Sequence, residues 1–298
     1  MAATRRLTEL TKVALDKTQL PSGPVTVALS GGADSAALAY ICLQAGVTVD
    51  ALHVDHGLPA SPRLAAASDA VATRLSIPIE SVAVEIEEGP SPEERAREAR
   101  YSAFDTRVNP VLTAHTRDDN AETILINLTR GTGPSGLTGI PYHRPPVTYR
   151  PILDISRSET RELATLVGLP FFDDPMNQDP SLTRNRIRHN ILPMLRAINP
   201  RVVEGLARAA TSLDRDGAFL DSLVPETGDA PGVPTGLVLT LPRPLADRLL
   251  QRLLNDEGVG VTADRMERAW SVVRGETEGQ DLAGGRRLTR RGALILVE

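Results

Sequence analysis

A short apolar run, residues 25–29, leads directly into a segment rich in glycine and hydroxyl groups. Glycines after a strand let the backbone approach a ligand closely and adopt positive φ angles. The N–H groups that open a following helix favour a bound anion. A tight serine-capped turn is the simpler alternative, but we expect a phosphate-binding loop, whose carboxylate could also hold Mg²⁺ or a sugar hydroxyl. The loop residues expected to contact a nucleotide are Ser30, Gly31, Gly32, Ala33, Asp34 and Ser35.

Two histidines and an aspartate follow the next apolar run, at His53, Asp55 and His56. A metal triad is disfavoured because successive side chains of a strand point to opposite faces. The carboxyl ends of parallel strands line the ligand crevice of an open sheet. We therefore expect Leu52 or His53 to lie near a bound adenine.

A third polar segment, residues 113–123, contains His115, Asp118, Asp119 and Glu122. Asp119 and Glu122 are three residues apart, so on a helix they share one face. Such carboxylates could merely cap the helix. They could also hold an ammonium group or Mg²⁺, and His115 would lie at the turn that precedes them.

Arginines dominate the basic residues of the chain, with 31 arginines and two lysines. Arg184 and Arg188 are four residues apart and share a helical face, with Arg186 offset from them. A solvated helix face is the simpler reading, but their place beside the predicted catalytic domain favours phosphate contacts. A second basic cluster lies near the end of the chain, at Arg286, Arg287, Arg290 and Arg291.

Composition excludes several classes of protein. No lysine occurs after position 17, so a GxxxxGK[ST] loop and a P-loop NTPase are excluded. One cysteine among 298 residues cannot form an intramolecular disulfide or a cysteine-rich metal site. The GxGxxG at residues 131–136 follows a predicted helix instead of a strand, so we reject a dinucleotide site there. The net charge of −5 argues only weakly against nucleic acid, since local basic patches remain.

Short apolar runs alternate with helical patterns in the first half of the chain, which predicts a doubly wound parallel α/β sheet. The expected strands are residues 25–29, 47–54, 81–86, 111–114 and 147–152, and the expected helices are residues 33–45, 62–75, 92–108 and 158–167. The 92–108 helix has a start signature, with Ser91 as N-cap and Pro92 at the first position.

The second half predicts a small, mostly helical C-terminal domain. We place the boundary between residues 1–198 and residues 199–298, at a natural break before Pro200. The elements expected around and beyond it are helices at residues 183–198, 201–223, 245–257 and 263–274, a linker at 225–236, a strand at 237–241 and a terminal hairpin that ends on 293–297.

The loop hexapeptide S-G-G-A-D-S resembles the signature of the N-type ATP pyrophosphatases, the PP-loop superfamily, which has an adenine nucleotide alpha-hydrolase-like fold. Four further motifs then follow in order: H-V-D-H-G-L, A-H-T-R-D-D-N-A-E-T, R-G-T-G-P-S-G-L and T-R-N-R-I-R-H. Together they resemble the tRNA(Ile)-lysidine synthetase family. Asn120 stands where many members carry glutamine.

The resemblance implies a two-step reaction on the wobble cytidine of an isoleucine tRNA with a CAU anticodon. The cytidine is first adenylated with ATP, and the ε-amine of free L-lysine then displaces AMP, which changes codon reading from AUG to AUA. It implies that the loop binds pyrophosphate, that Asp34 holds Mg²⁺, and that Asp119 and Glu122 hold the lysine amine. The arginines implied to contact phosphate or tRNA are Arg184, Arg186 and Arg188, with Arg186 among the catalytic residues. The lysine proton would go to one of the acids or to His115, and His115 is also expected to contact the bound nucleotide.

Three other readings stay open. A PP-loop thiolase would need more sulfur ligands than Cys42 supplies, the motifs disfavour an amidating synthetase, and the intact acids disfavour a non-catalytic ATP-binding or tRNA-binding module. The first residues lack the apolar core of a secretory signal, and no run approaches a membrane span. We therefore expect a cytoplasmic enzyme without membrane contacts, and the resemblance makes a homodimer an expectation.

Overall fold

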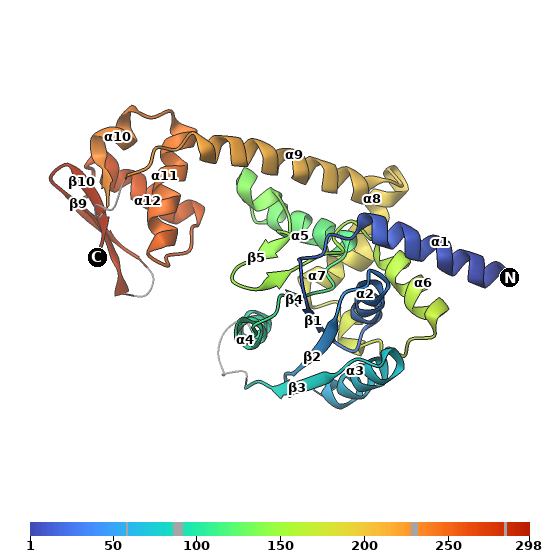
Figure 1. The fold of residues 1–298 in the computed structure, drawn as a ribbon. Coiled ribbons are helices and arrows are strands. Elements are labelled where there is room, and N and C mark those ends of the chain that lie inside the picture. Colours follow the sequence, from blue (N-terminus) through green and yellow to red (C-terminus); the bar gives the residue numbers. More distant parts are fainter. Residues whose placement is uncertain (58, 86–91, 228–231, 283–284) are drawn as a thin grey trace. The chain divides into compact units, whose positions relative to one another are not determined.

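The computed structural model describes residues 1–57, 59–85, 92–227, 232–282 and 285–298 (Figure 1). These residues form two compact units. The first unit comprises Met1–Gly131 with Gly136–Ala210, and the second comprises Thr132–Ser135 with Thr211–Glu298. Helix α9 (Val202–Ser222) contributes residues to both units. The proposed functional boundary at residue 198 stays a prediction.

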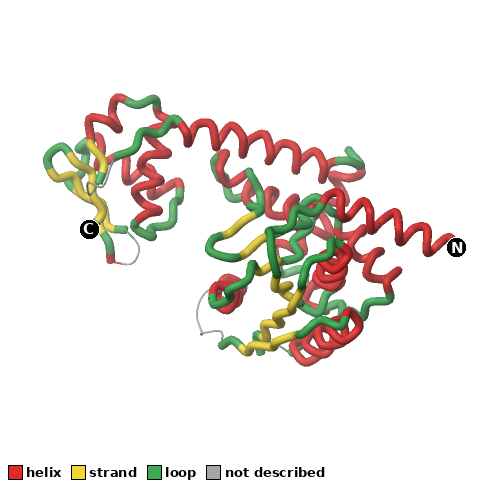
Figure 2. Tube along the Cα trace, in the orientation of Figure 1, coloured by secondary structure: helices red, strands yellow, loops and turns green. Residues whose placement is uncertain are grey.

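A six-stranded sheet forms the centre of the first unit, and its strands are yellow among the red helices in Figure 2. Their order is β3-β2-β1-β4-β6-β5. Strand β1 pairs in parallel with β2 and with β4, β2 pairs in parallel with β3, and β4 pairs in parallel with β6. Only the edge strand β5 runs antiparallel to its neighbour. The chain order reverses between β1 and β4, and ligands of open α/β sheets bind outside the carboxyl ends of strands at such a point. The strands are β1 (Val25–Ala28), β2 (Val49–Asp55), β3 (Ile79–Ala83), β4 (Val111–Leu112), β5 (His143–Arg144) and β6 (Thr148–Tyr149).

Helices cover both faces of this sheet, which confirms the predicted doubly wound fold. Val25 and Val27 face a core built with α1, α2, α3 and α6. Leu52 and Val111 belong to a second cluster with Tyr101 and Phe104 of α4 on the other face. The helices are α1 (Ala2–Lys17), α2 (Ala33–Gln44), α3 (Ser61–Leu75), α4 (Pro92–Asp105), α5 (Arg117–Thr129), α6 (Arg157–Val167), α7 (Thr183–Arg186) and α8 (Leu192–Ile198), with short helical turns η1 (Pro134–Leu137), η2 (Pro175–Gln178) and η3 (Ile187–Ile191).

The predicted strands and helices of this unit are confirmed, although most are a few residues shorter than expected. The predicted 183–198 helix is interrupted by the π-helical turn η3, which lies between α7 and α8. The expected N-cap Ser91 and the end of the third predicted strand at residue 86 lie outside the described residues. Helix α1 was not predicted, although its Leu10 and Ala14 are buried in the core.

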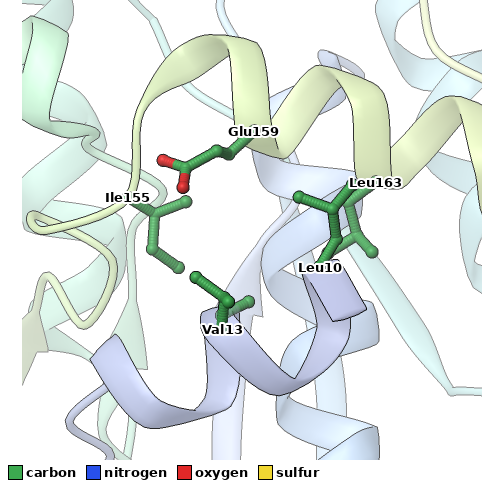
Figure 3. A pocket seen from close by; sticks show the side chains of 6 residues that line it. Leu10, Val13, Ile155, Glu159 and Leu163 are labelled. Carbon is green, nitrogen blue, oxygen red and sulfur yellow. The ribbon is translucent and has the colours of Figure 1, made fainter. Parts of the chain in front are cut away.

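Helix α1 packs against α6, and a small cavity lies between them (Figure 3). Its volume is about 10 Å³, and Leu10, Val13, Ile155 and Leu163 supply its apolar lining. That volume is roughly the space of a single water. The gap is therefore too small for a ligand.

The second unit combines helices with a four-stranded antiparallel sheet of order β7-β10-β9-β8. Its core contains Leu249, Leu250, Trp270, Val272 and Ile295. The predicted mostly helical character and the terminal hairpin are confirmed. The elements are β7 (Val233–Pro234), α10 (Thr235–Thr240), α11 (Arg243–Asp256), α12 (Ala263–Arg274), β8 (Gly279–Asp281), β9 (Arg287–Arg291) and β10 (Leu294–Val297).

Two predictions for this unit are wrong. The expected strand at 237–241 is part of helix α10, and only Val238 of its apolar residues is fully buried. A short apolar run cannot distinguish a strand from a buried helical turn by its periodicity. The expected linker at 225–236 contains β7, which pairs with β10, and its residues 228–231 lie outside the described residues. Across the described part of the chain, no helix combines the length and apolar character needed to cross a bilayer.

Candidate active site

The loop between β1 and α2 has a backbone that only glycine allows at one position. Gly31 has a φ of +80°, and a Cβ atom there would lie 2.5 Å from the carbonyl oxygen of Leu64. The carbonyl of Gly31 also accepts a hydrogen bond of 2.8 Å from the Phe172 amide. The predicted need for glycine in this loop therefore has a steric cause, since α3 packs directly on it.

Hydroxyl groups gather where this loop enters α2. The Ser35 hydroxyl donates to the Gly32 carbonyl at 2.9 Å, accepts from the Ser30 amide at 3.2 Å and lies 3.2 Å from the Ser30 hydroxyl. Ala33 begins the helix and Ser30 is exposed. The loop thus places hydroxyls and the amino end of a helix together, which is an arrangement suited to an anion.

Asp34 lies in the first turn of α2 and faces α6. The Thr160 hydroxyl donates to Asp34 Oδ1, and Arg157 Nε lies 3.8 Å from Oδ2. Burial raises the pKa of Asp34 to about 6, although the Thr160 hydrogen bond acts in the opposite direction. At neutral pH the Asp34 carboxyl is therefore still mostly ionised, with Arg157 as its ion-pair partner.

The predicted acid pair lies at the start of α5. Asp119 and the N-cap Thr116 form a capping box, in which Asp119 Oδ2 accepts from the Thr116 amide at 2.9 Å and from its hydroxyl at 2.7 Å. Glu122 follows one turn later with its side chain fully buried. The structure therefore brings Asp119 and Glu122 together on one face of α5, as the spacing predicts, while Asp119 also caps the helix.

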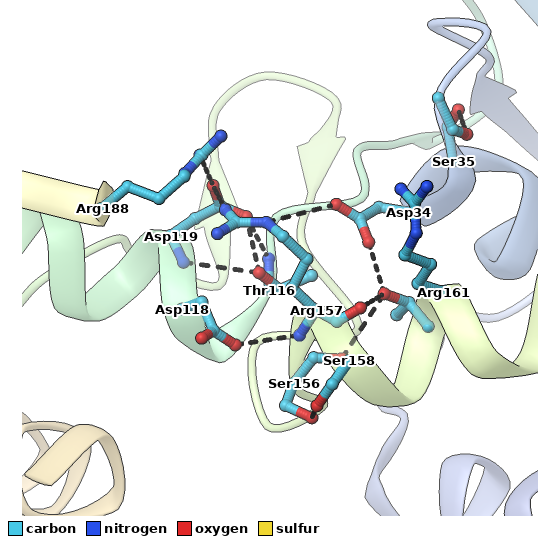
Figure 4. Close-up of polar contacts among 12 residues, drawn as sticks. Asp34, Ser35, Thr116, Asp118, Asp119, Ser156, Arg157, Ser158, Arg161 and Arg188 are labelled. Carbon is cyan, nitrogen blue, oxygen red and sulfur yellow. Dashed lines mark hydrogen bonds and ion pairs between the residues drawn. The ribbon is translucent and has the colours of Figure 1, made fainter. Parts of the chain in front are cut away.

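Arginines from α6, α7 and η3 converge on this pair, and Figure 4 shows two of them, Arg157 and Arg188. Arg157 Nη2 lies 2.6 Å from Asp119 Oδ1, and Nη1 lies 2.9 Å from Glu122 Oε1. Arg188 donates to Glu122 Oε1 at 2.8 Å and to Oε2 at 3.0 Å. Arg184 Nε lies 3.6 Å from Glu122 Oε2.

This convergence shifts the pKa of Asp119 and of Arg157. Burial alone would raise the pKa of Asp119, but the Arg157 charge, His115 and the Thr116 hydrogen bonds outweigh it and lower the value to about 2. Burial likewise opposes the charge of Arg157, but Asp119, Glu122 and Asp34 raise its pKa above the ordinary value. Asp119 and Arg157 are therefore ionised across the physiological range.

Arg157 and Thr160 were missed by the sequence analysis. Both lie in the first turns of α6, which begins with a capping box between Ser156 and Glu159. The Asp118 carboxylate fixes this start, because it accepts from the Arg157 amide at 2.9 Å. The S-x-x-E pattern could have located the helix start, but only the packing of α6 beside α2 and α5 brings Arg157 to the acids.

The remaining predicted residues have different surroundings. His53 is buried below the loop, with Nδ1 2.8 Å from the Leu29 carbonyl oxygen and 3.1 Å from the Ser68 hydroxyl. Burial, together with nearby arginines, lowers the pKa of His115 to about 3 although Asp119 acts against this shift. Arg186 is the last residue of α7 and is exposed, and the described contacts do not bring it to the acid pair.

A second cationic group, also missed, surrounds Tyr101 of α4. The guanidinium carbons of Arg144 and Arg97 lie 4.1 and 4.9 Å from the ring centroid. Arg150 is buried and donates to the Tyr101 hydroxyl at 2.9 Å. Arg97, Arg144 and Arg150 share this ring. Within the described residues Arg144 also pairs with Asp105 at 3.3 Å, but no carboxylate there pairs with all three arginines, so the group could attract an anion.

Comparison of the chain with known proteins identifies its family. A family model described as the PP-loop domain matches residues 2–195. The tRNA(Ile)-lysidine synthase of Thermobifida fusca is 38% identical over 303 residues, which cover 93% of this chain and 93% of that protein. This chain belongs to the tRNA(Ile)-lysidine synthase family. The enzyme of the same name from Nocardia farcinica is 39% identical over 91% of both chains, and that from Salinispora arenicola is 43% identical over 68% of this chain and 66% of its own length.

The solved structure of the U34-tRNA thiolase NcsA from Methanococcus maripaludis shares the fold of this tRNA(Ile)-lysidine synthase family member. The two chains are 18% identical, with a TM-score of 0.55 over 71% of this chain and 80% of the thiolase. This likeness supports the PP-loop α/β fold and carries no information on the substrate. The acid pair on α5 and the arginines of α6, α7 and η3 therefore have to be interpreted from their own chemistry.

Proposed function

We propose that this protein ligates L-lysine to C2 of the wobble cytidine of a tRNA(Ile) with a CAU anticodon, using ATP. The observation that carries the proposal is the placement of a phosphate-type loop and an acid pair, of which Glu122 is buried, at the carboxyl edge of one sheet in a chain of this family. In the first step the C2 oxygen of cytidine attacks the α-phosphorus of ATP, and pyrophosphate leaves. In the second step the ε-amine of lysine attacks C2, AMP leaves and the amine loses a proton.

The loop would hold the phosphates of ATP. Gly31 lets α3 and the backbone approach closely, and Ser30 and Ser35 present hydroxyls beside the amino end of α2. His53 donates through Nδ1 to the Leu29 carbonyl, while its buried Nε2 lacks a hydrogen-bond partner among the described residues. That free acceptor supports a place for the adenine amino group near His53.

Asp34 fits a Mg²⁺ ion. A Mg²⁺ ion that accompanies a nucleotide is usually held by one or two carboxylates and by the phosphates, and Asp34 offers one carboxylate next to the loop. When bound, the ion would offset the charge of the triphosphate. We therefore keep Asp34 as the proposed metal residue.

Asp119 and Glu122 would hold the lysine amine, with Arg184 and Arg188 positioned to contact phosphate or tRNA once the acids bind the substrate. The pKa of His115, near 3, makes its imidazole a weak base, so we favour a hydrogen-bonding role for His115 over proton removal. Arg186 is exposed and suits the tRNA backbone better than the reacting atoms. Residues 199–298 would bind the body of the tRNA.

Sulfur transfer by a thiolase is the rival activity, because a tRNA thiolase shares the fold of this chain. The single thiol, Cys42, is buried in α2, and burial raises its pKa to about 12. A thiol in that state is a poor nucleophile and metal ligand. Cys42 therefore supports lysine ligation over sulfur transfer. The cytoplasmic location and the homodimer stay predictions.

One assay tests the activity. The purified protein is incubated with ATP, Mg²⁺, radiolabelled lysine and a tRNA(Ile) transcript with the CAU anticodon, and the same transcript with a GAU anticodon serves as control. We expect label and pyrophosphate only with CAU. A folded protein that fails to incorporate lysine would contradict the proposal.

A further inference from the structure

Arg157 connects the two halves of the proposed active site. Its guanidinium lies 3.8 Å from Asp34 of the loop, 2.6 Å from Asp119 and 2.9 Å from Glu122. Figure 4 shows it between the Asp34 carboxylate and the start of α5. Among the described ion pairs, no other arginine reaches all three acids.

The carboxylate oxygens of the acid pair are all engaged. Asp119 Oδ1 binds Arg157 and its Oδ2 accepts from Thr116, while both oxygens of Glu122 accept from Arg188 and Oε1 also accepts from Arg157. The Glu122 side chain has no exposed surface. A lysine ammonium would therefore have to compete with Arg157 and Arg188 for these oxygens.

The charges of this group are balanced before any ligand binds. The carboxylates of Asp34, Asp119 and Glu122 face three arginines, Arg157, Arg184 and Arg188. The ammonium group of lysine would therefore approach a site whose negative charges are already neutralised by arginines, and it would be attracted only weakly. A triphosphate on the adjacent loop adds several negative charges beside Arg157, and guanidinium groups bind phosphate with two parallel hydrogen bonds.

We propose that Arg157 is a positioning residue that exchanges partners during the reaction, an inference that rests on the proposed function. Without ATP it occupies the acid pair in the place of the substrate amine. When ATP fills the loop, Arg157 turns to the phosphates, which frees Asp119 Oδ1 and one acceptor position of Glu122 Oε1 for the lysine amine, while Arg188 stays on Glu122. Lysine therefore binds after ATP, at the stage when the cytidine can be activated.

The test measures L-lysine binding to the full-length protein by isothermal titration calorimetry, with and without α,β-methylene ATP and Mg²⁺. We expect wild-type protein to bind lysine at least 10-fold more tightly with the analogue. Arg157→Gln should bind lysine equally well in both conditions, while its KM for ATP rises. Arg157→Lys keeps the charge and should retain part of the dependence.

Arg6→Gln is the matched control, because it removes an exposed ion pair between α1 and Glu162 of the same helix α6. It should keep the wild-type dependence on the analogue. If Arg157 had only a structural role, its substitution would weaken lysine and ATP binding together, and that result would overturn the inference. The inference would also be overturned if the analogue left the lysine affinity of the wild-type protein unchanged. Wild-type incorporation of lysine into tRNA, measured in parallel, separates these results from a failure of the proposed function itself.

Discussion

Arg184 and Arg188 of the first unit share one buried carboxylate, whereas the arginines of the terminal hairpin each have a separate partner. Arg286 pairs with Glu257, Arg287 with Asp281 and Arg291 with Glu298, all with side chains at least one third exposed. Arg290 donates to the Val273 carbonyl. The two clusters look alike in sequence, yet burial and a shared partner make the first a coupled network and leave the second a set of independent surface pairs.

This difference bears on where tRNA could bind. Exposed ion pairs contribute about 0–1 kcal/mol each, so phosphate can replace their acids at little cost. A buried group that loses one member leaves uncompensated charge, which costs far more. The hairpin therefore suits a tRNA surface, and the first cluster suits the chemistry.

The largest effect is expected for Glu122→Gln. The substitution leaves Arg157 and Arg188 without their buried counter-charge, and we expect the free energy of unfolding to fall by about 3–5 kcal/mol. Chemical denaturation measures this. Glu257→Gln, which breaks the exposed pair with Arg286, should cost less than about 1 kcal/mol. Equal losses of unfolding free energy in the two variants would contradict the claim that the first cluster is a coupled network and the second a set of independent pairs.

Asp34→Ala should lower tRNA-dependent pyrophosphate release by at least about 100-fold, because the loop loses its carboxylate for Mg²⁺. Release is measured with labelled ATP at saturating substrates. Asp69→Asn, which changes an exposed acid of α3, is the control and should behave as wild type. Normal release by the Asp34 variant would show that the loop has another role.

Asp119→Ala should separate the two steps of the reaction. We expect adenylation of the tRNA to survive better than lysine transfer, by about 10-fold, because the amine loses part of its site. Trapping of adenylated tRNA without lysine, followed by a lysine chase, measures each step. Equal losses in both steps would argue against amine binding at this acid.

The ion pair between Lys17 and Glu159 is more buried than the hairpin pairs and less buried than Glu122, and its contribution to stability should depend on pH. Its burial would raise its pKa, but hydrogen bonds from Lys17 and Ser156 lower it to about 2. A folded pKa below the ordinary value of 4.5 means that this contribution is present above about pH 4.5 and is lost as the pH falls towards 2. Lys17→Gln should reduce that loss, which is on the order of 2 kcal/mol in wild type. Stability measured from pH 6 to 2.5 checks it, and identical curves would contradict it.

The smallest effect on stability is expected for the double variant Arg286→Ala, Arg291→Ala. Its free energy of unfolding should stay within about 1 kcal/mol of wild type. If the hairpin meets tRNA, the slope of log affinity against log salt should fall by about one for each lost phosphate contact. A filter-binding salt series measures the slope, and an unchanged slope would exclude the hairpin from the tRNA surface.

The sequence alone determined the α/β class and the loop, since strand length, glycine placement and helix starts are local properties. It also determined that Asp119 and Glu122 share a face, because helical periodicity requires it. It could not identify the helix at 235–240 or the strand β7, because short segments take their conformation from the surfaces on which they pack.

Only the tertiary structure decided which charges meet. Arg157 lies 38 residues from Asp119 and 123 from Asp34 in the chain, and no local pattern relates them. Their contacts arise because α2, α5 and α6 all begin at one edge of the sheet. Likewise Arg184 and Arg188 reach Glu122 while Arg186 stays in solvent, because burial on one side of a helix selects which arginines share a carboxylate.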